Sequence, residues 1–407
     1  IMKATERFLN YVKIYTTSDP QSKTVPSSAR QFALARLLAD EMEALGISDV
    51  TGTDNCYVYG NIPATPGCEN IPAIGFIAHL DTSPDFAGQN VNPQVIPDYD
   101  GGEIRLGESG RILSPAQFPH LPSLKGRTLI STDGATLLGA DDKAGVSEIL
   151  TACERILAKN SPHGKICVAF TPDEEIGRGA DHFDFERFGA EFAYTLYGGE
   201  EGEINFENFN ASEAMFEING FNVHPGSAKN VMRNASLVAF EINAMLPGAE
   251  TPRDTEDYEG FFHLCDITGN VEKAQLRYII RDHSAAAYEV RKSTLRHIEK
   301  ILNERHGEGT VSLTIREQYA NMEEIIRKNF HLIETAKAAM AEIGLTPIVR
   351  PIRGGTDGAR LSFDGLPCPN LCTGGYAWHG PYEHITAEGL EACTQLIEAI
   401  VRQYAAE

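Results

Sequence analysis

The chain has 407 residues, 42% of them hydrophobic and 23% charged, which is the balance of a globular protein, and its formal net charge is −22. Its length exceeds the roughly 250–300 residues that one hydrophobic core usually supports, so we expect two domains. The negative charge argues against nucleic acid and anionic membranes as partners, because both are polyanions.

Two amphipathic helical patterns open the chain, at residues 6–14 and 29–45. Buried strands are predicted at residues 55–62, 74–80, 165–171 and 191–196. Residues 85–130 are rich in Pro, Gly, Asn and Gln and predict an irregular insertion with short hairpins. No apolar run approaches the roughly 20 residues that span a bilayer, and the first residues lack the apolar core of a secretion signal. The eight cysteines form no Cys-x-x-Cys pair, so we expect reduced thiols in a cytoplasmic protein.

The middle of the chain predicts a second domain. Its strands and helices are expected at residues 211–221 (strand), 229–246 (helix), 274–281 (strand), 285–303 (helix) and 310–319 (strand). This set predicts an inserted α+β domain at residues 208–320, within a main domain formed by residues 1–207 and 321–407. The main domain then resumes with elements at residues 333–343 (helix), 347–351 (strand), 369–375 (strand) and 387–404 (helix).

Two adjacent carboxylates, Asp141 and Asp142, precede an apolar helical run at residues 146–157. Gly139 and Gly145 around them allow a tight turn. One interpretation is an acidic helix N-cap, because Asp is a preferred cap residue. The other is a carboxylate held rigidly where it can bridge two metal ions, and the turn by itself does not separate the two.

Further acidic and imidazole side chains follow predicted strands. His79 and Asp81 end the strand at 74–80 and point to the same side. A lone buried histidine is more often structural, but the carboxyl ends of buried parallel strands are where α/β proteins place their sites. Glu174 and Glu175 follow the strand at 165–171, where a metal would relieve their repulsion; a solvated loop is the alternative.

With His379, these clusters recur at predicted strand ends over some 300 residues of sequence, which favours a metal centre over separate structural roles. Mixed imidazole and carboxylate donors suit Zn²⁺, with Co²⁺ or Mn²⁺ as alternatives. Two metals roughly 3.5–4 Å apart that share one carboxylate activate water and bind a carbonyl oxygen. A further carboxylate is then needed as general base.

Five motifs together resemble the M20 (M20B) family of dizinc metallopeptidases, in particular its tripeptide aminopeptidases. They are His79-Leu-Asp81, Gly139-Ala-Asp-Asp-Lys-Ala-Gly145, Thr171-Pro-Asp-Glu-Glu-Ile-Gly177, Asn222-Val-His-Pro-Gly226 and Arg353-Gly-Gly-Thr-Asp-Gly358. The resemblance covers residues 6–404. It implies a zinc-exopeptidase-like, three-layer α/β/α catalytic domain with a mostly parallel sheet, an inserted α+β lid, and cleavage of the N-terminal residue of tripeptides. It is also compatible with a homodimer.

The resemblance implies two zinc ions per chain, with Asp141 as the bridging ligand. His79 would bind one zinc, Glu175 and His379 the other, and Glu174 would be the general base.

The remaining roles implied by the resemblance are supporting ones. Asp81 matches the residue that orients the histidine ligand, and Asp142 supports the turn. His224 matches a lid histidine that binds substrate or the developing oxyanion. Arg281 and Arg353 match residues that pair with the tripeptide carboxylate. For these last three, a structural role on the surface or in the lid core is the alternative.

One position departs from the family. Tyr197 stands where the family has an aspartate that binds the same zinc as His79. A phenol, with a reference pKa near 10, is a poorer ligand than a carboxylate at neutral pH, so we expect the His79 site to bind metal weakly or to be empty. Glu200 or Glu201 is a candidate substitute, and Tyr15 is a lesser departure from the family. The rival functions are a related deacylase or carboxypeptidase, and a catalytically weakened peptide-binding protein.

Overall fold

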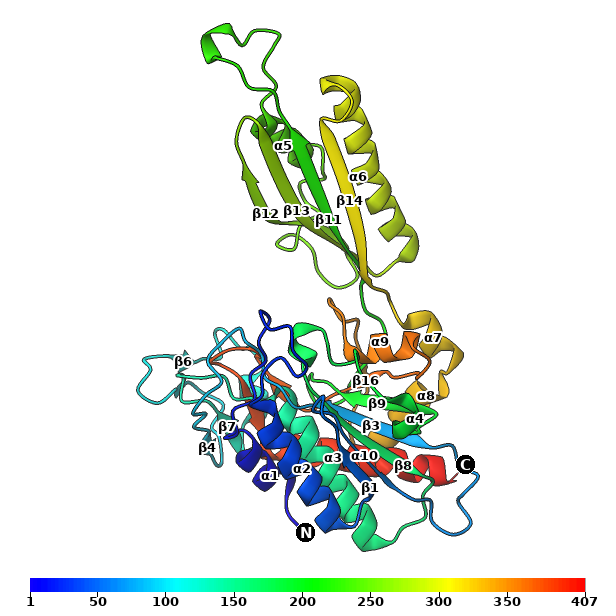
Figure 1. Ribbon diagram of the computed structural model, residues 1–407. Coiled ribbons are helices and arrows are strands. Elements are labelled where there is room, and N and C mark those ends of the chain that lie inside the picture. The colour runs from blue at the N-terminus through cyan, green and yellow to red at the C-terminus, as the bar shows by residue number, and fades with distance from the viewer. Residues whose placement is uncertain (407) are drawn as a thin grey trace. The chain divides into compact units, whose positions relative to one another are not determined.

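The computed structural model describes residues 1–406 and divides into two compact units (Figure 1). Unit 1 consists of Ile1–Phe206, Glu324–Arg350 and the chain from Thr356 onward. Unit 2 consists of Glu207–Glu323 and the short segment Pro351–Gly355. Each unit has its own main sheet.

Unit 1 is built on an eight-stranded sheet with the strand order β1-β2-β8-β3-β9-β16-β10-β15. The strands are β1 (Ser48–Gly52), β2 (Val58–Ile62), β8 (Ile166–Thr171), β3 (Ile74–His79), β9 (Phe192–Leu196), β16 (Asn370–Leu371), β10 (Glu203–Asn205) and β15 (Ile348–Val349). The central strands are parallel: β3 with β8 and β9, and β9 with β16. The carboxyl ends of β3 and β8 therefore meet at one edge, where His79 pairs with Thr171.

Helices cover both faces of this sheet, which gives three layers and confirms the expected α/β/α class. The helices on one side are α1 (Ala4–Tyr11), α2 (Gln31–Leu45), α3 (Ala140–Lys159), α8 (His331–Glu342) and α10 (Ala387–Ala406). Those on the other side are α4 (Phe185–Phe188) and α9 (Asp357–Phe363). Successive residues of β2 face opposite sides of the sheet and so identify the two helical layers. Gly60 lies against Met42 of α2, whereas Tyr59 packs on the other side with Phe183 and with Phe188 of α4. Every helix in residues 1–406 is too short or too polar to cross a membrane.

The irregular insertion expected at 85–130 is confirmed. It contains β4 (Gln94–Ile96), the hairpin of β5 (Ile104–Arg105) and β6 (Ile112–Leu113), a short 3₁₀ helix (Leu121–Leu124) and β7 (Leu129–Ser131). Strands β4 and β7 join β18 (His384–Thr386) and β17 (Gly375–Tyr376) in a small sheet of order β17-β18-β7-β4. This small sheet holds both ends of the loop between β17 and β18, which carries His379 and Glu383.

His384 lies at the centre of an aromatic cluster beside this small sheet. The His384 side chain is fully buried, its Nδ1 lies 2.7 Å from the Tyr382 carbonyl oxygen, and its Nε2 lies 2.8 Å from Nε2 of His120. Burial lowers the pKa of His384 from 6.5 to about 4. The ring is therefore neutral when the protein is folded at neutral pH.

We expect His384 to make the stability of the protein pH-dependent below neutrality. Between pH 6.5 and about 4 the unfolded chain binds a proton at His384 that the folded chain does not. This contribution is fully present above pH 6.5 and is lost as the pH falls, by an amount on the order of 3 kcal/mol. Urea unfolding as a function of pH measures it. The variant His384→Gln should show a shallower slope, the control His297→Gln on the exposed face of α6 should not, and equal slopes in all three would contradict the prediction.

Unit 2 is an antiparallel four-stranded sheet covered by two helices. The sheet has the order β12-β13-β11-β14, with β12 (Phe261–Gly269), β13 (Lys273–Asp282), β11 (Asn210–Asn219) and β14 (Val311–Tyr319). Helices α5 (Ala235–Ala244) and α6 (Ala285–His306) pack on it over a core that includes Phe216, Leu276 and Leu295. The alternation of buried and exposed residues along β11 and β13 follows from this one-sided cover.

Several sequence predictions of elements were wrong in detail. The helix expected at 229–246 begins only at Ala235, because the Asn234 side chain accepts hydrogen bonds from the N–H groups of Ser236 and Leu237 and caps it there. Strands β1, β10, β12 and β18 and the helices α4, α7 (Glu323–Lys328) and α9 were not predicted. These helices are shorter than the window over which helical periodicity becomes visible.

Candidate metal and catalytic site

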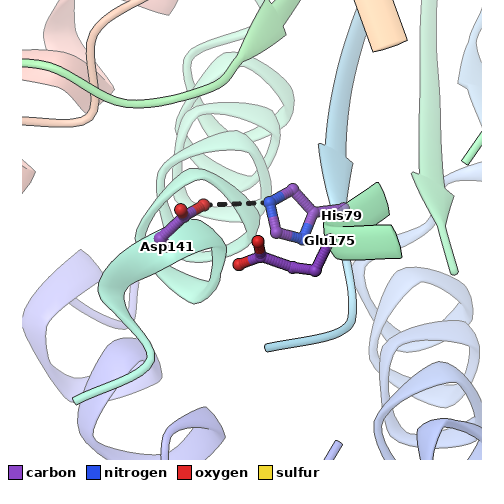
Figure 2. A group of neighbouring side chains, drawn as sticks. All are labelled: His79, Asp141 and Glu175. Atoms are coloured by element: carbon purple, nitrogen blue, oxygen red, sulfur yellow. Dashed lines mark hydrogen bonds and ion pairs between the residues drawn. The ribbon is translucent and has the colours of Figure 1, made fainter. Parts of the chain in front are cut away.

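His79 is the last residue of β3, and its ring points toward Asp141, with Glu175 close by (Figure 2). Its Nδ1 lies 3.0 Å from the carbonyl oxygen and 3.3 Å from Oδ1 of Asp81, whereas its Nε2 lies 2.9 Å from Oδ1 of Asp141. The ring is 3% exposed. With the Nδ1 proton donated to Asp81, displacement of the Nε2 proton by a metal would leave the Nε2 lone pair directed at the cluster, as in a metal-binding histidine.

Asp81 also connects the ends of β3 and β8. Its two carboxylate oxygens accept hydrogen bonds from the N–H groups of Glu174 (3.0 Å) and Glu175 (3.1 Å). The side chain is fully buried. One carboxylate thus orients the histidine ring and also holds the backbone of the two glutamates in place. The sequence predicted only the first of these two roles.

The loop after β8 carries the two glutamates on a short 3₁₀ helix, Glu174–Ile176. Asp173 before it has a left-handed backbone (φ 59°), and its side chain accepts hydrogen bonds from Ser27 and from the Gln31 amide at the start of α2. These hydrogen bonds fix the orientation of the loop, because breaking them would leave the buried carboxylate of Asp173 unpaired, which is costly.

Glu175 and His379 complete the cluster. His379 Nε2 lies 3.0 Å from Oε2 of Glu175 and 3.2 Å from Oδ2 of Asp141. Ligand atoms of His79, Asp141 and Glu175 lie within 4.8 Å of one another. Glu174 lies at the edge of this group, with its Oε2 3.8 Å from Nε2 of His79. Five side chains from distant parts of the sequence therefore meet in unit 1.

The electrostatics of the cluster favour binding of a cation. Burial and the charge of Asp141 raise the pKa of Glu175 to about 8, and burial raises that of Glu174 well above its usual range. Burial opposes ionisation of Asp141, yet hydrogen bonds from His379 and His79 lower its pKa to about 2. Hydrogen bonds to Asp141 and Glu175 raise the pKa of His379 to about 11. Protons thus neutralise the charge of the three clustered carboxylates, and a bound metal ion would displace these protons.

The donors fit a divalent metal ion. Oε1 of Glu175 is buried without a hydrogen-bond partner, which is costly unless a ligand occupies it. Imidazole nitrogens and carboxylate oxygens are the mixed set that Zn²⁺, Co²⁺ and Mn²⁺ accept.

Two of the site motifs do not lie at strand ends, contrary to the sequence prediction. Asp141 stands at the start of α3, and Asp142 accepts a hydrogen bond from the N–H of His79 (3.0 Å). His379 lies in the loop between β17 and β18, outside the main sheet. Their side chains reach the cluster from the start of a helix and from a loop, rather than from strands.

Glu383 holds the turn that carries Asp141, a role that the sequence did not indicate. Its Oε2 accepts hydrogen bonds from the N–H groups of Leu138 (2.7 Å) and Gly139 (2.9 Å), and its Oε1 accepts one from that of Asp141 (3.0 Å). The side chain is 1% exposed. Its position four residues after His379 was the only available signal, and an isolated acid in a loop is normally solvated.

Tyr197 follows β9 and lines the site. Its backbone N–H donates to the Leu371 carbonyl oxygen (3.0 Å), and its side chain lines a small pocket with His79, Glu174 and Asp357. Burial and the surrounding carboxylates raise the pKa of the phenol well above 10. The phenol is therefore protonated at neutral pH.

The acids considered as substitutes for the missing aspartate are engaged elsewhere. Glu200 pairs with Arg350 at 2.6 Å, and Glu201 pairs with Arg127. The Tyr15 hydroxyl accepts a hydrogen bond from Arg30, whose guanidinium also stacks over the ring at 4.3 Å, so that contact is structural.

The three predicted substrate-binding residues all lie in unit 2. His224 is exposed, with its Nδ1 accepting a hydrogen bond from the N–H of Gly226 (3.1 Å). The Arg281 guanidinium donates to the carbonyl oxygens of Ser212 (3.1 Å) and Ile280 (2.9 Å). Arg353 donates to the carbonyl oxygens of Asp257 (2.9 Å) and Glu259 (2.8 Å). Both arginines thus have structural partners within their unit, and their roles toward substrate stay predictions.

Comparison with known proteins places this arrangement among peptidases. The model of Peptidase family M20/M25/M40 matches residues 133–403. A protein named Peptidase T from Clostridium perfringens is 53% identical over 407 residues, covering 99% of each chain. A protein of the same name from Alkaliphilus oremlandii is 52% identical over 402 residues, covering 98% of each chain.

Two solved structures share the fold. Aminopeptidase PepT from Bacillus cereus has a TM-score of 0.79 at 23% identity and covers 100% of this chain and 98% of that one. The YXEP protein of Bacillus subtilis, described as a dinuclear metal binding peptidase from the M20 family, has a TM-score of 0.65 at 13% identity and covers 98% and 97%. At these identities the likeness concerns the fold alone, and it extends over nearly the whole chain.

Proposed function

This chain belongs to peptidase family M20/M25/M40, and from that premise we propose that it is a metal-dependent aminopeptidase that removes the N-terminal residue of tripeptides. The observation that carries the proposal is the position of Glu174. Its largely buried carboxylate lies beside the donors His79, Asp141, Glu175 and His379 without being needed as a donor itself. A metal centre with an adjacent free carboxylate is the arrangement that hydrolysis of a peptide bond requires.

The proposed mechanism assigns one task to each side chain. His79, Asp141, Glu175 and His379 would hold the metal, proposed as Zn²⁺, which supplies a Lewis acid for water and for the substrate carbonyl. Glu174 accepts a proton from the attacking water on one carboxylate oxygen and passes it to the leaving amine. Its raised pKa suits this return of the proton, because a very weak base would not hold it between the two steps.

Further residues orient the metal donors and Glu174 or bind the substrate. Asp81 keeps the His79 ring oriented and the two glutamates in place through its backbone contacts. We propose unit 2 as the lid domain, with His224, Arg281 and Arg353 binding the tripeptide. The arginines would then exchange backbone carbonyl partners for the substrate carboxylate, which as a charged acceptor forms the stronger hydrogen bond. The eight cysteines are all free thiols, which supports a reducing compartment such as the cytoplasm.

Substrate trials test the proposal. Trialanine should be cleaved to alanine and dialanine, N-acetylated trialanine should not be cleaved, and activity should vanish after chelation and return with Zn²⁺, Co²⁺ or Mn²⁺. Product analysis by mass spectrometry shows which bond is cut. Cleavage of the acetylated peptide, or release of the C-terminal residue, would instead indicate the deacylase or carboxypeptidase activity that the fold also supports. Binding of trialanine without turnover would indicate a peptide-binding protein.

A further inference from the structure

His379 is the proposed metal donor that the fold buries least. The exposed fraction of its side chain is 39%, compared with 3% for His79, 4% for Glu175 and 15% for Asp141. It lies in the loop between β17 and β18, where its backbone has a left-handed conformation (φ 65°). A ring that packing does not enclose needs a hydrogen-bond partner to keep the one orientation in which it can bind a metal.

Asp85 is the partner of this ring. Its Oδ2 lies 3.2 Å from Nδ1 of His379, whereas Nε2 of the same ring lies 3.0 Å from Oε2 of Glu175. When a metal binds at Nε2, Nδ1 keeps its proton and donates it to the Asp85 carboxylate. This hydrogen bond selects the tautomer in which Nε2 is the ligand, and it makes that nitrogen more basic.

The loop that carries Asp85 is anchored on both sides. Before Asp85, the hydroxyl of Thr82 lies 3.0 Å from that of Thr17, and both side chains are buried. After Asp85, the Ala87 carbonyl oxygen accepts a hydrogen bond from the N–H of Leu137 (2.9 Å). The Asp85 side chain is 68% exposed, but the backbone from which it projects is therefore held in place.

The His379–Asp85 pair repeats the arrangement of His79 and Asp81. In that pair, Oδ1 of Asp81 lies 3.3 Å from Nδ1 of His79, and Nε2 faces the cluster. Both carboxylates belong to the short segment that follows β3. One stretch of chain thus reaches both imidazole donors, although these are 300 residues apart in the sequence.

We propose that Asp85 is a positioning residue, which accepts the Nδ1 proton of His379 and so holds Nε2 of this ring ready to bind the metal ion. This inference rests on the metal centre of the proposed function. Partners of this kind typically contribute about 10–100-fold to metal affinity. The contact is exposed, and exposed charged contacts contribute little, so we expect the lower end of that range.

The test measures zinc affinity, by competition with a chromophoric chelator, in Asp85→Ala, Asp85→Asn and the control Glu108→Ala. Glu108 is an exposed acid between β5 and β6, and its replacement changes the net charge by the same amount. Asp85→Ala should weaken zinc binding about 10-fold. Asp85→Asn keeps an oxygen that can accept the Nδ1 proton, so it should retain part of the affinity. The control should bind zinc as tightly as the unaltered protein.

A double-mutant cycle with His379→Ala separates positioning from a general effect on the fold. In the His379→Ala background the ring is absent, so adding Asp85→Ala should not weaken the residual zinc binding further. With trialanine as substrate, Asp85→Ala should have a lowered kcat when zinc is limiting. In excess zinc its kcat should recover, and KM should stay nearly unchanged throughout.

Three results would overturn the inference. The first is equal zinc affinity in Asp85→Ala and the unaltered protein. The second is an equal loss with and without the His379 ring, because Asp85 would then act on the metal directly or through the fold. The third is Asp85→Asn as weak as Asp85→Ala, which would make charge rather than the hydrogen bond the cause. If the zinc affinities follow the expectation but no variant hydrolyses trialanine in excess zinc, the proposed function would be wrong and the positioning role would stand.

Discussion

Replacement of Glu174 by Gln should lower kcat for tripeptide hydrolysis by about 10³-fold or more while leaving the bound metal in place. General acid–base catalysis contributes typically 10²–10⁴-fold, and an amide cannot accept the proton of the attacking water. The metal should remain because His79, Asp141, Glu175 and His379 supply the donors without Glu174. Steady-state kinetics with trialanine and elemental analysis of the same preparation measure both quantities.

The neighbouring residue provides the matched control for this experiment. Glu175→Gln changes the same type of side chain one position along, but removes a donor that lies 3.0 Å from His379. It should therefore lose metal as well as activity, and excess metal should restore part of the activity. If Glu174→Gln also lost its metal, Glu174 would be a ligand; if it kept full activity, the base would be another group of the pocket.

Replacement of Glu383 by Gln should weaken metal binding by about 10–100-fold, the usual effect of removing a group that orients a ligand. It should also lower the free energy of unfolding by about 1–3 kcal/mol. Glu383 is 1% exposed and accepts three backbone hydrogen bonds from the turn that carries Asp141. A glutamine amide presents one oxygen and one NH₂ group, so at least one buried N–H loses its acceptor. Zinc titration and urea unfolding of the metal-free protein separate the two effects.

Glu388→Gln is the control for this second experiment. Glu388 also accepts a backbone hydrogen bond, from the N–H of Thr128 (3.0 and 3.1 Å to its two oxygens), but it is exposed and lies at the start of α10. Its replacement should leave zinc affinity unchanged. If Glu383→Gln bound zinc as tightly as the unaltered protein, the geometry of the Asp141 turn would not depend on this carboxylate.

The parts of the site that could be predicted from the sequence are those carried by the main strands. The continuously apolar runs of β3 and β8 are visible in the sequence because strands buried on both faces contain few polar residues. Their ends then placed His79 with Asp81, and Glu174 with Glu175, at one edge of the sheet. The strand pattern does not place Asp141 and His379, because Asp141 lies at the start of a helix and His379 lies in a loop. Their assignment depended on resemblance rather than on periodicity.

The sequence by itself determined the α/β class, the buried strands, the kind of donor atoms and the departure at Tyr197. These are local properties, because burial periodicity and side-chain chemistry can be read within a short window. The tertiary structure alone decided which polar groups pair. Glu383 meets Leu138 across 245 residues, Asp81 accepts two backbone N–H groups from another strand's loop, and Tyr197 shares a pocket with Glu174. Hydrogen bonds of this kind form between segments that only the folded chain brings together, so no local pattern predicts them.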